Sequence, residues 1–340
     1  MPRTKLSLCT YNLYNLNEPG LPIYQDTNGW SQEEYANKIQ WAADKISAMD
    51  ADVWAFQELW HAASLNNVLS SSGLASDYTL LVPSDHAGGK IICAGAVKTS
   101  ILEGEPEWID AFPDTFKLSS SGDDPQAPDI AVQIDSFSRP VLHFKIKPRS
   151  NGKVIHVYVC HFKSKGPTRI HRESWYSKSI YGKHSEALGG AISTIRRTAE
   201  AAALRMILTE RMKGTDTPVV VMGDLNDSQH SNTLNILTGQ PNYLLSGLSK
   251  GGSDVDLYST GTLQEYRSHR DVFYTHVFNK TRESLDHILV SQEFYDNSKK
   301  RIWAFKNLEI MNDHLNRDDH KSTGSTDHGI VRAEFEYRPA

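Results

Sequence analysis

Six short polar motifs in the sequence each adjoin an apolar run with the composition of a β-strand. Their candidate functional residues are Asn12, Glu58, His161, Asp224, Asn226, Asp286, Asp327 and His328. Taken singly, each is explained as well by a cap or a turn, because Gly, Asp and Asn are common turn residues. Six such motifs in one chain are harder to explain as turns alone. We therefore expect these side chains to meet at the rim of a sheet.

The types of these residues suit the hydrolysis of a phosphodiester. That reaction must neutralise the negative charge that builds on the phosphoryl oxygens and on the leaving group. A hard divalent cation does so, and Mg²⁺ prefers oxygen ligands with few protein carboxylates. Glu58, helped by Asn12 and Asp327, would supply such a metal site. Asp286 would orient His328, because a carboxylate on one ring nitrogen fixes the tautomer and stabilises the imidazolium.

Other catalytic classes lack their signatures in this sequence. The chain contains no H-E-x-x-H or H-x-H-x-D cluster for zinc, no G-x-S-x-G elbow and no Walker loop. The three cysteines, Cys9, Cys93 and Cys160, lie far apart in apolar runs. We interpret them as small buried hydrophobic side chains, not as a disulfide framework or a zinc ribbon.

The composition is that of an ordinary globular protein. Apolar residues make up 39% of the 340 residues and the formal net charge is -5, which argues against binding nucleic acid through bulk charge. No apolar run approaches the length of a membrane span, and the N-terminal residues show no signal-peptide pattern. We expect a cytoplasmic protein if Met1 is native, and a secreted one if the chain is a mature form.

The segments between the motifs predict the elements that position them. Ser31 and Glu34 form a capping box before an amphipathic helix, and Thr194–Met212 predicts a long helix. A loop is predicted at Ser119–Pro128. Strands are predicted at Lys5–Tyr11, Val53–Gln57, Ile91–Val97, Ile130–Ile134, Val141–Ile146, Val154–Cys160, Val219–Met222, Ile288–Val290 and Ile330–Phe335. This order favours two sheets packed face to face and flanked by helices, in one domain over residues 1–340.

The ordered set TYNLYN, FQE, HFKSKG, GDLND, SLDHILVS and TDHGIV resembles the endonuclease/exonuclease/phosphatase superfamily, the group of DNase I and the apurinic endonucleases. The resemblance spans Asn12 to His328 and implies an α/β fold, a four-layer sandwich with two central β-sheets flanked by helices. Asn12 and Glu58 match the metal site of that family, with Glu58 as the principal ligand, and Asp327 matches the second acid beside the metal. The expected cofactor is Mg²⁺ or Mn²⁺, with Ca²⁺ as a third candidate.

The resemblance also implies catalytic roles. Asp224 and Asn226 match the pair that orients the attacking water and the phosphate. His161 matches the histidine of the DNase I-like branch, and Asp286 matches the carboxylate partner of His328. Both Asp224 and His328 remain candidates for the general base.

Residues Pro167–Gly190 look like an insertion relative to compact members of the family. Basic residues outnumber acids in and just before this segment, and aromatic residues are interleaved with them. A solvated loop and a substrate contact fit this composition about equally. The position directly after His161 favours contact with a phosphate backbone and unstacked bases. The predicted substrate-binding residues are Lys163, Lys165, Arg169, Arg172, Trp175 and Tyr176.

These features predict a metal-dependent nuclease, with DNA favoured over RNA and endonuclease over exonuclease action. HFKSKG, RRTAEAAALR and YTHVFNKTRESLDHILVS are similar to segments of bacterial nucleases that are often predicted to be extracellular. A sphingomyelinase-like or inositol-phosphate phosphatase-like enzyme would use the same site. A non-catalytic nucleic-acid-binding module is disfavoured, because all the key positions are filled. The sequence indicates no obligate protein partner.

Overall fold

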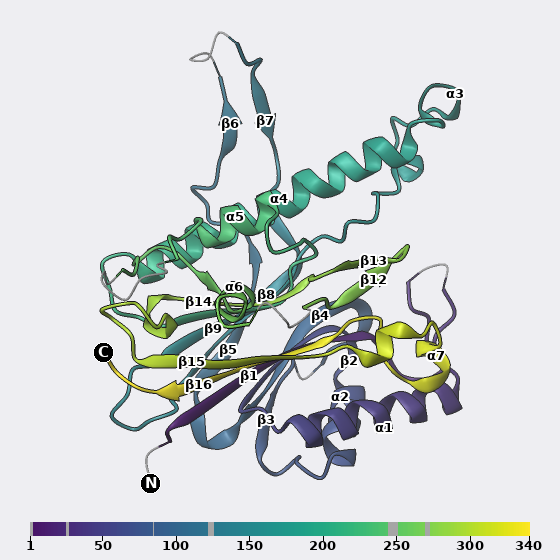
Figure 1. The fold of residues 1–340 in the computed structure, drawn as a ribbon. Coiled ribbons are helices and arrows are strands. Elements are labelled where there is room, and N and C mark those ends of the chain that lie inside the picture. The colour runs from purple at the N-terminus through teal and green to yellow at the C-terminus, as the bar shows by residue number, and fades with distance from the viewer. Residues whose placement is uncertain (1–2, 25–26, 84, 122–125, 244–250, 269–272) are drawn as a thin grey trace.

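Two six-stranded mixed β-sheets pack face to face, with helices on both outer faces (Figure 1). The computed structural model describes residues 3–24, 27–83, 85–121, 126–243, 251–268 and 273–340. The first sheet has the strand order β15 (Trp303–Met311), β16 (Ile330–Tyr337), β1 (Lys5–Leu16), β2 (Val53–His61), β4 (Ala87–Lys98) and β3 (Tyr78–Leu81). The second has the order β11 (Tyr258–Ser259), β14 (Asp286–Val290), β10 (Val219–Asp224), β9 (Ile155–His161), β8 (Ser136–Ile146) and β5 (Leu102–Ala111).

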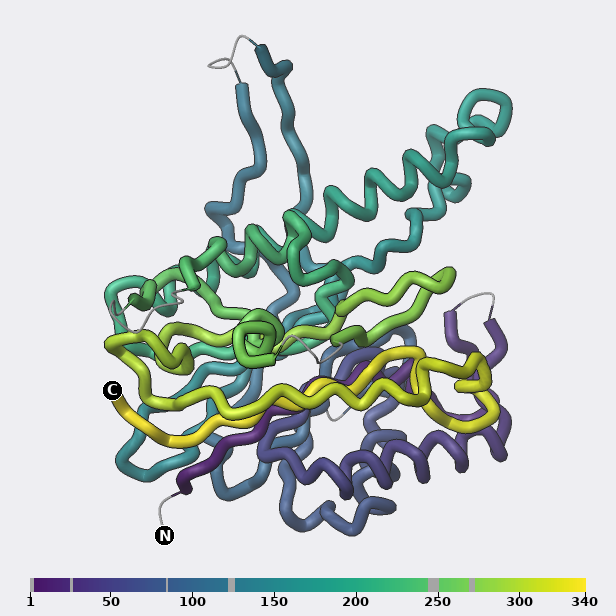
Figure 2. Tube along the Cα trace, viewed as in Figure 1, coloured from purple at the N-terminus to yellow at the C-terminus, as the bar shows by residue number. Residues whose placement is uncertain are grey.

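Helices on the outer faces complete a four-layer sandwich, which confirms the predicted fold. Helices α1 (Gln32–Met49) and α2 (Ala62–Ser71) cover the first sheet, and α4 (Ser185–Met212) and α5 (Asn232–Thr238) cover the second (Figures 1 and 2). Among the described residues, no helix combines the length and apolarity needed to cross a membrane. The shorter elements are β6 (Leu118–Ser120), β7 (Ile130–Val132), α3 (Lys178–Tyr181), α6 (Thr260–Glu265), β12 (His276–Phe278), β13 (Thr281–Glu283) and α7 (His320–Thr323).

Strand β10 shows how the sequence pattern builds the layers. Successive side chains of a strand point to opposite faces of its sheet. Val219 and Val221 pack in the cluster that contains the buried side of α4, and Val220 and Met222 pack between the two sheets. An uninterrupted apolar run therefore marks a strand that is buried on both faces. Side chains from both sheets form this inner core, which holds the two sheets together.

The two predicted helices are present, but one starts earlier than predicted. Ser31 and Glu34 form the expected capping box at the start of α1. Helix α4 begins at Ser185, nine residues before the predicted start at Thr194. The glycines in this first part lower helix propensity, but tertiary packing overrides it. A Cβ at Gly189 would lie 2.3 Å from the Thr168 carbonyl oxygen, so this glycine lets the helix lie against the preceding segment.

The strand predicted at Ile130–Ile134 is present as β7 over Ile130–Val132, but it joins neither main sheet. Within the described part of the chain, β7 pairs only with β6 in a separate hairpin that projects from the body (Figure 1), and Ile130 is 58% exposed. The hairpin also takes up the first two residues of the predicted loop Ser119–Pro128, of which residues 122–125 lie outside the described part of the chain. Strand propensity alone carries no information about burial.

Candidate active site

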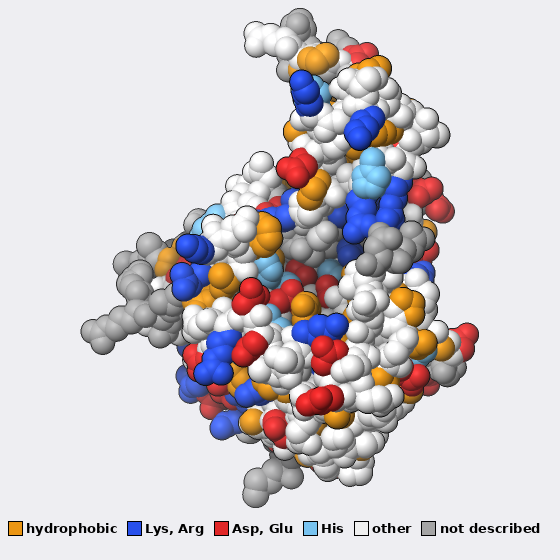
Figure 3. All heavy atoms as spheres, turned by 90° about the vertical axis from the view of Figure 1, so that its right-hand side faces the viewer, with side chains coloured by type: hydrophobic (Ala, Val, Ile, Leu, Met, Phe, Trp, Pro, Cys, Tyr) orange, Lys and Arg blue, Asp and Glu red, His pale blue; other side chains and the backbone are white. Residues whose placement is uncertain are grey.

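The pairing of the strands explains why residues far apart in sequence meet. Strands β9 and β10 are parallel, so His161 and Asp224 lie opposite each other where both strands end. Strand β14 runs antiparallel to β10, which places Asp286 opposite Asp224 as well. In the first sheet, the regular pairing of β1 with β2 runs to Asn12 and Gln57, where its register shifts, and β16 begins near the same end. Acidic and histidine side chains consequently meet in a hollow on one face of the molecule (Figure 3).

Four predicted residues converge on the carboxylate of Asp224, which is 1% exposed. The Asn12 side-chain amide donates a hydrogen bond to Asp224 Oδ2 over 3.1 Å. The Nε2 atoms of His161 and His328 lie 3.5 Å and 3.8 Å from the same oxygen. The backbone N–H of Asn226 donates to Asp224 Oδ1 over 2.9 Å. Burial raises the pKa of Asp224 to about 7, even though the nearby His328 charge opposes the rise.

His328 is held by Asp286, as the sequence predicted for this pair. The His328 Nδ1 atom lies 2.8 Å from Asp286 Oδ2. Burial works against protonation of the ring, but the carboxylates of Asp286 and Asp224 outweigh it and raise the pKa of His328 well above its ordinary value. At neutral pH the ring is therefore a cation. In that state its Nε2 atom carries a proton and is a hydrogen-bond donor.

His161 has the opposite protonation. Burial, together with the nearby charges of Arg139 and His328, lowers the pKa of His161 well below its ordinary value. The ring is consequently neutral at physiological pH. Its Nδ1 atom is buried and has no hydrogen-bond partner among the described residues. A protonated His328 and a neutral His161 thus flank the carboxylate of Asp224. Their different surroundings give the two rings different charge states.

The predicted metal-site residues Glu58 and Asp327 are close enough to repel each other. Burial and the charge of Asp327 raise the pKa of Glu58. Glu58 Oε2 accepts the backbone N–H of Asn15 over 3.0 Å, and Asp327 Oδ1 is buried without a hydrogen-bond partner among the described residues. Crowded carboxylates with an unsatisfied oxygen fit a hard cation, because the cation would relieve both the repulsion and the unmet hydrogen-bonding capacity.

Among the described residues, two groups of three side chains offer ligand atoms within 4.8 Å of one another. One group is Asp224, Asp286 and His328, and the other is His276, Asp327 and His328. Glu58 belongs to neither group. His276 was missed in the sequence: it enters the site through an isolated bridge to His328 and carries no strand-end pattern. Its ring centroid lies 4.9 Å from that of His328.

Several motif residues have a strained backbone. Glu58 and Asn226 have φ angles of +62° and +54°, in the left-handed region that side chains with a Cβ rarely adopt. Gly223, just before Asp224, has a φ of +140°, and a Cβ there would lie 2.0 Å from the Cys160 carbonyl oxygen. The close approach between β9 and β10 thus requires a glycine directly before Asp224. Strain of this kind persists where the surrounding structure holds a functional side chain in place.

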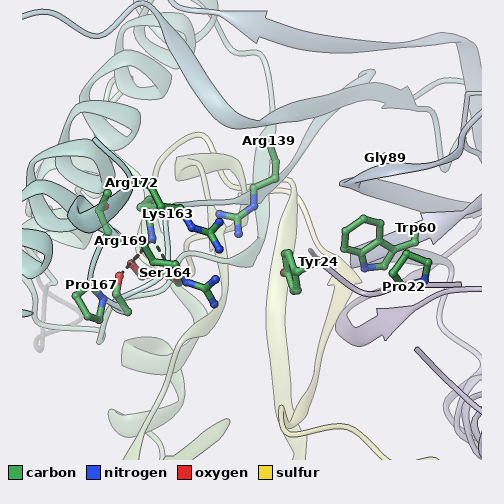
Figure 4. Close-up of a pocket in the computed structure, with 12 residues that line it drawn as sticks. Pro22, Tyr24, Trp60, Gly89, Arg139, Lys163, Ser164, Pro167, Arg169 and Arg172 are labelled. Atoms are coloured by element: carbon green, nitrogen blue, oxygen red, sulfur yellow. Dashed lines mark hydrogen bonds between the residues drawn. The ribbon is translucent and has the colours of Figure 1, made fainter. Parts of the chain in front are cut away.

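The predicted substrate-binding residues separate into two sets. Lys163, Arg169 and Arg172 line a cavity of about 830 Å³ beside the site (Figure 4). Lys165 instead forms an ion pair with Glu283 at 2.9 Å. Trp175 and Tyr176 do not line the cavity but lie further along the segment, where both pack near Tyr181. The sequence also missed Arg139, Tyr24 and Trp60, which line the same cavity.

Lys38 of α1 is a buried lysine near the predicted metal site. It is 1% exposed, and its ammonium group lies 4.6 Å and 5.1 Å from the ring centroids of Trp30 and Tyr14. Burial lowers the pKa of Lys38 to about 7, although the charges of Asp327 and Glu58 partly oppose this. In the unfolded chain the amine stays protonated up to about pH 10.5. The cost of burying its charge is therefore fully present below pH 7 and fades toward pH 10.

Replacement of Lys38 by methionine is expected to stabilise the metal-free protein at low pH. The gain in the free energy of unfolding at pH 6 should be on the order of a few kcal/mol and should be clearly smaller at pH 9. Urea unfolding at the two pH values measures it. Lys45→Met is the matched control. Lys45 is also a lysine of α1 that lies over a tryptophan ring, that of Trp41, but its side chain keeps access to solvent. An equal gain at both pH values would show that packing, not charge, is responsible.

Comparisons with known proteins agree with the fold described above. No curated protein sequence matches the chain. A solved endonuclease/exonuclease/phosphatase family protein from Bacteroides thetaiotaomicron is 16% identical, with coverage of 98% of this chain and 96% of that chain and a TM-score of 0.54. The human Nocturnin catalytic domain with bound sulfate is 14% identical, with coverage of 98% and 95% and a TM-score of 0.57. The mannosyl-6-phosphatase from Bacteroides thetaiotaomicron is 15% identical, with coverage of 97% and 99% and a TM-score of 0.52.

At such identities these similarities establish the fold. The sequence model of the Endonuclease/Exonuclease/phosphatase family matches residues 9–328, nearly the whole length. That stretch contains every residue that the strand ends bring together around Asp224. The chain therefore belongs to the Endonuclease/Exonuclease/phosphatase family.

Proposed function

We propose that this chain is a divalent-metal-dependent phosphodiesterase that cleaves nucleic acid, with DNA favoured, and that residues 1–340 act as one catalytic domain. Family and fold support a metal-dependent phosphoesterase. The observation that carries the proposal is the convergence of Asn12, His161, His328 and Asn226 on Asp224, next to the carboxylates of Glu58 and Asp327.

The residues proposed to hold the cation are Glu58, Asn12 and Asp327. Mg²⁺ or Mn²⁺ suits them best, because these side chains offer oxygen atoms; Ca²⁺ is the third candidate. When bound, the cation would neutralise the charge that develops on the phosphoryl oxygens. The Asn12 side-chain oxygen already accepts the backbone N–H of Tyr14 over 3.0 Å, which holds the amide in one orientation.

The remaining residues have proton-transfer and orienting roles in this proposal. Asp224, with its pKa near neutrality, accepts a proton from the attacking water. Asn226 fixes that carboxylate through its backbone N–H, and its side chain donates to the Phe162 carbonyl oxygen over 3.0 Å. Protonated His328 donates a hydrogen bond to a phosphoryl oxygen, and neutral His161 donates one from the opposite side. The general base is thus assigned to Asp224 in preference to His328.

The choice of nucleic acid rests on the cationic cavity beside this centre. Arg139, Lys163, Arg169 and Arg172 contribute to its lining although the net charge of the chain is -5. Phosphodiester backbones are bound through such local positive charge. Sphingomyelin and inositol phosphates are the competing substrates, because the same centre would hydrolyse their phosphoesters.

A substrate panel tests the proposal directly. We expect the purified protein with Mg²⁺ or Mn²⁺ to cut plasmid, linear duplex or single-stranded DNA, and EDTA to reduce the rate by more than about 10²-fold. RNA, sphingomyelin and inositol phosphates are run in parallel with each metal, including Ca²⁺. Cleavage of a lipid or of a small phosphoester, without any cleavage of nucleic acid, would overturn the proposed substrate. Full activity in EDTA would overturn the metal requirement.

A further inference from the structure

The cavity beside the site has two chemically different walls (Figure 4). One wall carries Arg139 of β8 together with Lys163, Arg169 and Arg172 from the segment that follows β9. The other carries Pro22, Tyr24 and Trp60 from the β1–α1 loop and from β2. The described residues that line the cavity include no Asp or Glu. Its volume of about 830 Å³ is in the range of sites for small organic ligands.

The cationic wall is arranged for an anion. Burial and the nearby charges of Arg139 and Arg196 lower the pKa of Lys163 to about 8, so the cations in this region repel one another. The Lys163 ammonium group donates to Ser164 Oγ over 3.1 Å and lies near the Gly166 carbonyl oxygen, which fixes it in place. Arg139 donates to the Phe162 carbonyl oxygen over 3.1 Å. A guanidinium group fixed in this way matches the oxygens of a phosphate.

The aromatic wall offers a flat face. The Tyr24 ring is 47% exposed and packs edge-on against Trp60, with ring centroids 5.2 Å apart and an interplanar angle of 82°. Trp60 itself is 6% exposed and donates from Nε1 to Asn15 Oδ1 over 3.1 Å. Trp60 is therefore a fixed support, and Tyr24 is the ring that a ligand can reach. Stacking of an unpaired base on such a ring is a common source of affinity for single strands.

Arg139 connects this cavity to the phosphodiester centre. The positive charge of Arg139 acts to lower the pKa of Glu58 and His161, and also that of Lys163 and Tyr24. Trp60 lies two residues after Glu58, and Lys163 lies two residues after His161. Both walls therefore continue directly from the residues around Asp224, so a group bound in the cavity is adjacent to the reacting phosphate.

We infer that the cavity binds the nucleotide next to the scissile phosphodiester, with its second phosphate among Arg139, Arg169 and Arg172 and its base against Tyr24. This inference rests on the proposed nuclease function and deepens it. The base must leave its stack to reach Tyr24, and a duplex opposes this. The enzyme should therefore prefer single strands and frayed ends over intact duplex.

Binding to the metal-free protein tests the cavity apart from catalysis. The probe is thymidine 3′,5′-bisphosphate in EDTA, measured by calorimetry beside thymidine, inorganic pyrophosphate and inositol 1,4-bisphosphate. We expect the nucleoside bisphosphate to bind at least about tenfold more tightly than each of the others, and Arg172→Gln and Tyr24→Leu each to weaken it about tenfold. Lys178→Gln on α3 removes the same charge outside the cavity and should leave binding unchanged.

Three outcomes would overturn the inference. Equal binding of pyrophosphate, with no effect of Tyr24→Leu, would reduce the cavity to a simple anion site. Tighter binding of the inositol bisphosphate would assign it to a phosphorylated sugar-like ring. An equal loss for Lys178→Gln and Arg172→Gln would indicate general surface charge.

A kinetic comparison then ties the cavity to the reaction. With Mg²⁺, the ratio of kcat/KM for a single-stranded oligonucleotide to that for its duplex should exceed about 10 and fall toward 1 in Arg172→Gln, mainly through KM. A ratio near 1 in the parent would overturn the inferred preference. If no nucleic acid is cleaved at all, the proposed function fails, and the binding experiment still decides what the cavity accepts.

Discussion

Replacing His328 with glutamine is expected to lower kcat by more than about 10²-fold, because the variant loses the positive charge of the ring. Glutamine is chosen because it keeps much of the side-chain shape. In the parent, the ring lies between the carboxylates of Asp286 and Asp224. Its charge also lowers the pKa of Asp224. Without that charge, Asp224 should hold its proton to higher pH, so the acidic limb of the kcat/KM profile should move to higher pH.

The pH–rate profile separates this role from a merely structural one. A variant that is only less well folded would lose amplitude without a shift of the limb. His230→Gln is the control, because His230 is an exposed histidine in the loop after β10. We expect its profile to coincide with that of the parent. If His328→Gln cleaves DNA as fast as the parent, the assignment of the site is wrong.

The second large effect is expected from Glu58→Gln, through the metal. The substitution removes one of two carboxylates that repel each other and keeps an oxygen that can accept the Asn15 N–H. We expect Mn²⁺ affinity to fall by more than the roughly 10–100-fold cost of losing a residue that only supports a ligand. The loss of activity should be comparable and partly recovered at high Mg²⁺ concentration. Titration calorimetry with Mn²⁺ and a Mg²⁺ series of rates measure the two effects.

The stability of the same variant provides an internal check. Because the charge of Asp327 no longer meets a second carboxylate, metal-free Glu58→Gln should unfold at the same or a higher temperature than the parent. Glu33→Gln, an exposed glutamate in the first turn of α1, is the control for metal affinity. Unchanged Mn²⁺ binding in Glu58→Gln would remove Glu58 from the proposed metal site.

The sequence predicted the layers and the strand-end residues because both depend on local patterns. An apolar run such as that of β10 specifies a strand buried on both faces, and the polar residue that follows it must lie at the rim. Parallel pairing then brings Asp224 and His161 together without further information. The capping box at Ser31 and Glu34 is equally local.

The remaining features depend on contacts between distant segments. Arg139, Tyr24 and His276 lie in stretches with no strand-end pattern, and only packing of the two sheets brings them to the site. Lys165 follows the same basic pattern as Lys163 but meets Glu283 of β13 instead. The early start of α4 has the same origin, since the close contact at Gly189 outweighs the helix propensity of its glycines.

The two walls of the cavity belong to different sheets. Substitutions in the core between the sheets can therefore change which substrates the cavity accepts. Tyr24 and Trp60 are placed by the first sheet, and Arg139 and Arg172 by the second. Their separation follows from the side chains packed between the sheets, because a close-packed core transmits changes in volume. Drift at inner positions such as Leu142 can therefore widen or narrow the cavity while leaving every contact residue in place. Homologous enzymes with the same catalytic residues can in this way diverge in the substrates they select.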